Sequence, residues 1–83
     1  MATDWASKGL QVNAIAPGYF DTPLNAALVS DPEFSAWLEK RTPAGRWGKV
    51  DELVGACIFL ASSASSFVNG QTIFVDGGIT ASL

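Results

Sequence analysis

The sequence contains no histidine among its 83 residues, and only one cysteine and one tyrosine. Without histidine, the chain cannot supply a histidine general base or a histidine-liganded metal site. A single cysteine excludes an internal disulfide. Because Cys57 lies within an apolar helical pattern, we expect it to be buried, in a protein of a reducing compartment.

Positive charge and long apolar runs are also scarce. Five Lys and Arg stand against eight Asp and Glu, for a net charge of −3. The cations form no cluster, which argues against a nucleic-acid partner because phosphate neutralisation needs several grouped cations. No apolar run approaches the roughly 20 residues of a membrane span, and the opening MATDWASKG lacks the apolar region of a signal peptide. We therefore expect a soluble, cytoplasmic protein with no membrane partner.

Apolar residues, in contrast, are abundant for so short a chain. Hydrophobic residues make up 48% of the sequence, with three Trp and five Phe. A chain of this length forms at most one domain and buries only roughly 60–65% of its unfolded surface. This excess predicts surfaces that other protein covers.

The stretch Val12–Thr22 organises the sequence. A short run of alternating apolar residues predicts a buried strand over Leu10–Ala16, which Pro17 ends by removing a backbone donor. Gly18 permits a sharp turn or a close approach of the backbone to another group. Thr22 then reads as the N-cap of a helix that begins with proline. In open α/β sheets, ligands bind beyond such carboxyl ends of strands.

Helical patterns surround this strand. Residues 2–8 predict a helix that ends at Gly9, and residues 22–29 and 31–41 predict two more, the latter opened by Asp31 and stopped at Thr42-Pro43. Val50–Ala61 predicts the longest helix, with an apolar circumference that this small chain cannot cover by itself.

Three loop features leave alternatives open. Arg46, in the loop 44–49, could face a substrate carboxylate, but a structural arginine that ties the loop to a helix end is the commoner case. Asn69-Gly70 has the local signature of a β-hairpin turn. Asp76-Gly77-Gly78 is a weak signal, more often a turn that ends a strand than a ligand site.

Several motifs together carry a family resemblance. They are VNAIAPGYFDT, TPAGRWG, ELVGACIFLASSASSFVNG and VDGG, in this order. With them the whole chain resembles the C-terminal third of a short-chain dehydrogenase/reductase, nearest to the gluconate 5-dehydrogenase-like branch. The resemblance implies an α/β fold: the C-terminal part of a Rossmann-type doubly wound parallel sheet, as a single partial domain over residues 1–83. It implies that Gln71–Asp76 runs parallel to the first strand, and that residues 22–41 form a mobile lid over a sugar-acid substrate.

The resemblance also implies a cofactor, NAD or NADP. Members of the family transfer a hydride between nicotinamide and a hydroxyl or carbonyl carbon, and Pro17, Gly18, Phe20 and Thr22 match positions that meet the nicotinamide end. The glycine-rich phosphate loop and the catalytic Ser and Tyr-x-x-x-Lys of the family are absent from this sequence. Tyr19 has Pro23 four residues on and cannot be that tyrosine. We therefore expect no catalytic residue here, no metal, and no nicotinamide cofactor bound by this chain alone.

Three functions from different classes remain open. The chain could be part of a longer oxidoreductase, a free-standing assembly module, or a fragment that complements a separate N-terminal portion. In the family, the long helix and the last strand form a subunit interface. We accordingly expect homo-oligomers through Val50–Ala61 and Gln71–Asp76.

Overall fold

The computed structural model describes residues 2–82. Its strands are β1 (Ala14–Pro17), β2 (Phe20–Asp21), β3 (Gly48–Lys49) and β4 (Thr72–Val75). Its α-helices are α1 (Ala2–Trp5), α2 (Ala26–Val29), α3 (Pro32–Arg41) and α4 (Val54–Ala61). Short 3₁₀ helices span Ala6–Lys8, Pro23–Asn25, Val50–Leu53, Ser63–Ser65 and Thr80–Ser82.

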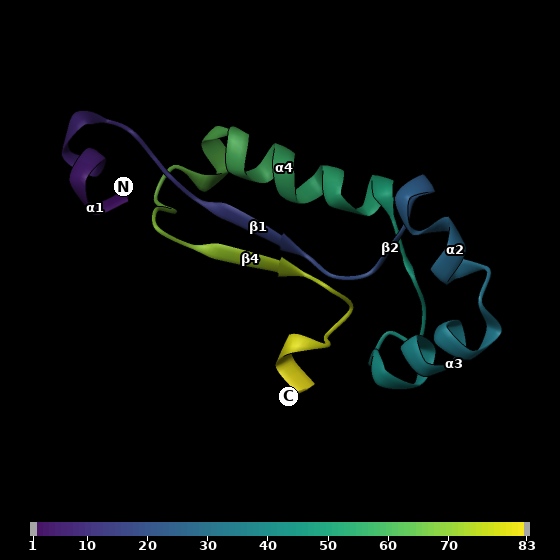
Figure 1. Cartoon of the computed structure of the whole chain (residues 1–83). Coiled ribbons are helices and arrows are strands. Elements are labelled where there is room, and N and C mark those ends of the chain that lie inside the picture. The colour runs from purple at the N-terminus through teal and green to yellow at the C-terminus, as the bar shows by residue number, and fades with distance from the viewer. Residues whose placement is uncertain (1, 83) are drawn as a thin grey trace.

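The central sheet consists of β1 and β4, which pair in parallel with Ala14 opposite Thr72 and Pro17 opposite Val75. Parallel strands need a long crossover, and α2, α3 and α4 lie within it (Figure 1). The predicted α/β class and parallel pairing are confirmed. The hairpin suggested by Asn69-Gly70 does not form, because the backbone N–H of Gly70 instead bonds the carbonyl of Val12.

The first strand is shorter than predicted at its start and longer at its end. Residues 11–13 precede the ladder and are held by side chains: the N–H of Val12 donates to Asn69 Oδ1 at 2.9 Å, and Asn13 Oδ1 accepts from the N–H of Gln71. Pro17 remains in the strand. The N–H groups of Ala14 and Gly18 donate to the carbonyls of Gln71 and Val75, so the nitrogen of Pro17 faces the open edge, where no donor is needed.

The predicted helix boundaries hold best where capping chemistry is local. Asp31 Oδ1 accepts from the N–H groups of Glu33 and Phe34, and α3 follows as predicted. Gly9 ends the first helical segment with φ 79°. After Thr22, the segment 22–29 is not one helix: a 3₁₀ turn at Pro23–Asn25 precedes α2.

The long apolar helix lies along one face of the strands (Figure 1) and is exposed rather than buried. It begins as the 3₁₀ turn Val50–Leu53 and continues as α4, in which no residue is buried. The predicted burial of Cys57 is wrong, since its side chain is exposed. Ile58 is 62% exposed. The helix covers one face of only two strands, so its outer side has no protein to pack against.

The expected excess of apolar surface is confirmed. Among the described residues, the buried apolar side chains are Phe20 and Leu38. The first strand, expected to be buried on both faces, has exposed residues at its ends, Ala14 and Pro17. The radius of gyration is 15.7 Å, against about 12 Å for a compact domain of this length. Within residues 2–82, every helix is too short or too polar to cross a membrane.

Candidate functional site

The candidate site lies beyond the carboxyl ends of β1 and β4, where the two parallel strands open toward α2 and α3 (Figure 1). Pro17 closes β1 with an exposed side chain. Gly18 follows and donates its N–H to the carbonyl of Val75 at 2.9 Å. A Cβ on Gly18 would stand 2.7 Å from Cβ of Asp76. The glycine is therefore required by the approach of the two strand ends.

Phe20 and Thr22 come next, on and just after β2. The Phe20 side chain is 6% exposed, and its carbonyl accepts from Asn25 Nδ2 at 2.9 Å. Thr22 occupies the N-cap position with extended backbone, as predicted, but its hydroxyl makes no capping hydrogen bond. The predicted capping bond is thus wrong, and the Thr22 hydroxyl is not engaged in capping the helix.

The short β2–β3 pairing was not predicted. Phe20 pairs with Gly48 and Asp21 with Lys49, again in parallel. A Cβ at Gly48 would approach Cε1 of the Phe20 ring to 2.7 Å, so a glycine is needed there. This bridge fixes the loop 44–49 against the segment that follows β1. A pair of two-residue strands carries too little periodicity to be recognised from sequence.

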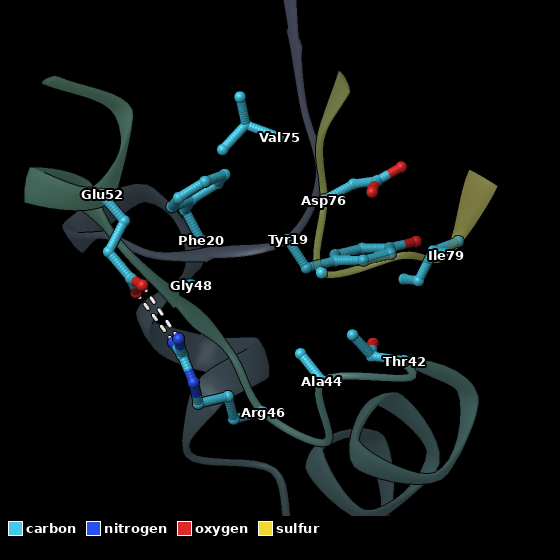
Figure 2. Close-up of a pocket in the computed structure, with 11 residues that line it drawn as sticks. Tyr19, Phe20, Thr42, Ala44, Arg46, Gly48, Glu52, Val75, Asp76 and Ile79 are labelled. Atoms are coloured by element: carbon cyan, nitrogen blue, oxygen red, sulfur yellow. Dashed lines mark hydrogen bonds and ion pairs between the residues drawn. The ribbon is translucent and has the colours of Figure 1, made fainter. Parts of the chain in front are cut away.

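A small cavity of about 90 Å³ lies between these elements. Its lining comes from the ends of β1 and β4 and from the loop that follows α3 (Figure 2). The residues are Tyr19, Phe20, Thr42, Ala44, Arg46, Gly48, Glu52, Val75, Asp76, Gly77 and Ile79. Phe20 is therefore both a predicted cofactor-contact residue and a wall of this pocket.

Arg46 has the structural role that was the favoured interpretation. Its guanidinium donates to both carboxylate oxygens of Glu52, at 2.7 and 2.8 Å (Figure 2). Glu52 also accepts from the N–H of Lys49 at 2.9 Å, at the start of the 3₁₀ turn. The hydrogen bond from Arg46, followed by that from the Lys49 backbone, lowers the pKa of Glu52 to about 2. Arg46 is thus engaged by a carboxylate of its own chain.

Asp76 likewise serves the turn that ends β4. Its carboxylate accepts from the N–H of Gly78 at 2.9 Å and from the N–H of Thr80 at 3.1 Å. Hydrogen bonds from Thr80, then from Gly78, hold the pKa of Asp76 below its ordinary value. Gly77 and Gly78 have positive φ of 65° and 98°, which explains both glycines. The interpretation as a turn that ends a strand is confirmed.

Thr42 has a polar atom without a partner. Its side chain is 5% exposed, and Oγ1 makes no hydrogen bond. The methyl carbon faces Gly77, where an added Cβ would be 2.8 Å away. Sequence reasoning treated Thr42 only as the residue that ends a helix, and no sequence signal indicated a buried, unpaired hydroxyl in a pocket wall.

An aromatic cluster beside the pocket was also missed. The Tyr19 ring makes edge contacts with Phe34, Trp37 and Trp47 at centroid distances of 5.9, 6.1 and 6.0 Å. Trp47 Nε1 donates to Ser35 Oγ at 3.2 Å. These contacts join the turn after β1, helix α3 and the loop 44–49 into one unit. Phe34 and Trp37 share one face of α3, but Tyr19 and Trp47 come from the turn after β1 and from the loop 44–49. Helical periodicity therefore could not reveal the cluster.

The residues present fit one end of a nicotinamide cofactor. The Thr22 hydroxyl makes no capping bond and can offer a hydrogen bond of the kind an amide requires. The carbonyls of Tyr19 and Phe20 each accept one hydrogen bond within the chain, and each keeps a second lone pair. The sequence contains no glycine-rich loop of the kind that holds a pyrophosphate. Among residues 2–82, no group of three or more His, Cys, Asp or Glu is placed to bind a metal.

Comparison with known proteins gives consistent matches over the whole chain. A family model described as enoyl-(acyl carrier protein) reductase matches residues 1–80. Gluconate 5-dehydrogenase of Gluconobacter oxydans is 68% identical over 83 residues, which is 100% of this chain and 32% of that protein. The 5-keto-D-gluconate 5-reductase of Escherichia coli K12 is 58% identical over 79 residues, 95% of this chain and 31% of that protein.

A solved structure agrees in detail. The gluconate 5-dehydrogenase of Burkholderia cenocepacia J2315, crystallised in complex with NADP and tartrate, superposes with a TM-score of 0.94 at 69% identity. The match covers 100% of this chain and 32% of that one. The chain therefore spans about a third of the length of the relatives that it matches.

Proposed function

Because the chain belongs to the short-chain dehydrogenase/reductase family, we propose that it is part of an NAD(P)-dependent oxidoreductase acting on a sugar acid. The substrate class that we propose is gluconate or 5-ketogluconate. The observation that carries the proposal is the 68% identity to gluconate 5-dehydrogenase across all 83 residues. We place the chain at the carboxyl-terminal third of the enzyme, within its Rossmann-type sheet.

In this proposal, the chain positions the cofactor, and the rest of the enzyme supplies the residues that take part in the reaction. When bound, the cofactor supplies hydride exchange with the substrate carbon. Pro17 and Gly18 shape the turn, the Phe20 backbone bonds the carboxamide, and the Thr22 hydroxyl reaches the same group or a nearby phosphate. The open Thr22 hydroxyl supports this role. Positioning of this kind contributes several kcal/mol to catalysis.

We propose that residues 22–41 act as the lid over the substrate. Two observations support this. The segment lies beyond the strand ends (Figure 1), and α3 is attached to the turn after β1 through the Tyr19 ring. A lid joined to the cofactor-contacting turn in this way would move with it, so that substrate closure and nicotinamide positioning are coupled.

A chimera tests the proposed function. This chain replaces the matching residues of the Gluconobacter oxydans relative, and reduction of NAD and NADP is followed with gluconate as substrate. We expect the chimera to retain gluconate-dependent turnover within about tenfold of the relative. A Thr22→Val change in the chimera should raise KM for the cofactor. A folded chimera that oxidises no sugar acid would contradict the proposal.

A second candidate is a non-catalytic fragment that assembles with itself or with a separate N-terminal portion. The exposed outer side of α4 favours it, because Val54 and Ile58 are about half exposed or more. A symmetric contact between two copies of this helix would cover both apolar faces at once. Light scattering of the purified chain tests self-association.

A further inference from the structure

The segment between β2 and α2 is held by one residue, Asn25. It directly precedes α2, in the position from which an asparagine side chain commonly caps a helix, but it makes no capping bond there. Its Nδ2 instead reaches back along the chain and donates to the carbonyl of Phe20 at 2.9 Å. Its backbone N–H donates to the carbonyl of Thr22, also at 2.9 Å. Asn25 therefore fixes both Phe20 and Thr22, which we propose to contact the nicotinamide end of the cofactor.

The polar backbone groups of Phe20 lie on the edge of β2 that β3 does not occupy. The N–H of Gly48 donates to the carbonyl of Tyr19 at 2.9 Å, so this carbonyl points toward β3. Because the peptide bond between Tyr19 and Phe20 is trans, the N–H of Phe20 points the opposite way. In an extended strand, the N–H and the C=O of one residue lie on the same side. Both groups of Phe20 thus face away from β3, and Asn25 holds the C=O.

This pair of backbone groups is complementary to a primary amide. A carboxamide has one carbonyl acceptor and two N–H donors, so the adjacent N–H and C=O of Phe20 can bond both kinds of group. The Phe20 carbonyl has two lone pairs, of which Asn25 takes one and leaves the other. Loss of the bond from Asn25 would free this peptide to rotate, and a misplaced binding group loses much of its positioning effect.

We propose that Asn25 is a positioning residue for the nicotinamide end of the cofactor. It acts through Phe20, by holding the Phe20 carbonyl so that the backbone N–H and C=O of that residue face the carboxamide. The inference rests on the proposed function, because it concerns the same site. It also separates two roles of Asn25: a purely structural link between β2 and α2 would affect stability and all parts of the cofactor alike.

The substitution Asn25→Asp in the chimera tests the proposal. Aspartate has nearly the same shape as asparagine and caps helices equally well, but its carboxylate has no N–H to donate and repels the Phe20 carbonyl. Calorimetric titration compares NADPH with 2′-phospho-ADP-ribose, which lacks the nicotinamide; NADH and ADP-ribose replace them if the chimera prefers NAD. We expect Asn25→Asp to weaken binding of the reduced cofactor about tenfold and to leave binding of the nicotinamide-free fragment unchanged. Asn25→Gln keeps the amide donor and should restore part of the affinity.

Asn13→Asp is the matched control. Asn13 Nδ2 donates to the carbonyl of Val68 at 3.1 Å, so this substitution removes the same kind of hydrogen bond. It does so just before β1 begins, at the opposite end of the strand from the candidate site. Both aspartates should lower the melting temperature, and only Asn25→Asp should weaken the cofactor more than its fragment. Equal weakening of the two ligands by Asn25→Asp, an unchanged cofactor affinity, or the same selective loss in Asn13→Asp would overturn the proposal.

The unchanged chimera separates this proposal from the proposed function. If it oxidises gluconate but Asn25→Asp affects both ligands alike, only the role of Asn25 fails. If it is folded and binds neither cofactor, both proposals fail.

An NMR spectrum of the full ¹⁵N-labelled chain gives a readout that needs no cofactor. Because Asn25 bonds the peptide that joins Phe20 to Asp21, Asn25→Asp should shift the amides of these two residues more than those of Leu28 and Val29 in α2. Larger shifts in α2 would show that Asn25 serves the helix, and they would overturn the proposal.

Discussion

At the turn after β1, the Cα of Gly18 faces Asp76 so closely that no side chain fits. We predict that Gly18→Ala lowers the free energy of unfolding by about 1–3 kcal/mol, because the new Cβ would stand 2.7 Å from Cβ of Asp76. Urea unfolding followed by tryptophan fluorescence measures the change.

Gly55 in α4 is the matched control for Gly18. An added Cβ there meets nothing within 4 Å, so Gly55→Ala should raise stability by about 0.5–1 kcal/mol through helix propensity. Equal effects of the two alanines would show that the approach of Gly18 to Asp76 is not the cause.

The Glu52 carboxylate makes the free energy of unfolding depend on pH. Its pKa is about 2 in the folded chain against 4.5 as the ordinary value. Because the pKa of Glu52 is lower in the folded chain, its stabilising contribution is present above pH about 4.5 and is lost as pH falls toward about 2. Asp76, whose pKa is also lowered, contributes in the same direction.

We therefore predict that Glu52→Gln makes the decrease in melting temperature between pH about 5 and about 2 smaller than in the unchanged chain. The share of this decrease that comes from protonation of Asp76 should remain. Melting curves recorded by circular dichroism across this range measure the difference. A fall in the variant as large as in the unchanged chain would show that the pair of Arg46 and Glu52 is not responsible.

At the scale of elements, the contacts of Tyr19 attach α3 to the turn after β1. We predict that Tyr19→Ala lowers stability by about 2 kcal/mol, less than for a fully buried ring because Tyr19 is partly exposed. Hydrogen exchange should also quicken in the α3 amides, since that helix loses its anchor.

Phe67 provides the aromatic control for Tyr19. Its side chain is fully exposed, so Phe67→Ala should change stability by no more than about 0.5 kcal/mol. Exchange in α3 that is equally fast in the two variants, or unchanged in both, would contradict the anchoring role of Tyr19.

Elements whose signals are local were predictable from the sequence. Asp31 before Pro32 caps α3, and Gly9 ends the first helical segment, because both depend on residues adjacent in the chain. The β2–β3 bridge and the Tyr19 cluster join residues far apart in sequence, and no short pattern encodes them. The burial of Cys57 was mispredicted for another reason: an apolar helix is buried only if there is enough protein to cover it.

For the molecule as a whole, the main feature is an apolar surface that this chain does not cover. The chain is extended, with principal dimensions of 50 × 26 × 20 Å. The outer side of α4 and the open edge of β1 face away from the rest of the chain. A two-stranded sheet has little stability without further cover. Either more of the same polypeptide or a second copy would supply it.

We predict that the chain alone self-associates at micromolar concentration and that Ile58→Glu prevents this. Ile58 is among the most exposed residues of α4, so the charge would disrupt a contact there while leaving the fold of one copy intact. Leu24→Glu, at an exposed apolar position outside α4, is the control. A folded monomer of 8.7 kDa for the unchanged chain in light scattering would contradict the prediction.

We propose that the cofactor site is divided between two parts of the enzyme. This chain would hold the nicotinamide end, and the other two thirds of the relatives' length would hold the phosphates. Titration of NADH and NADPH against the chain alone and against the chimera, followed by fluorescence, tests this directly. We predict saturable binding by the chimera and none by the chain alone below about 100 μM, equivalent to roughly −5.5 kcal/mol. Saturable binding of either cofactor by the chain alone below that concentration would contradict the claim.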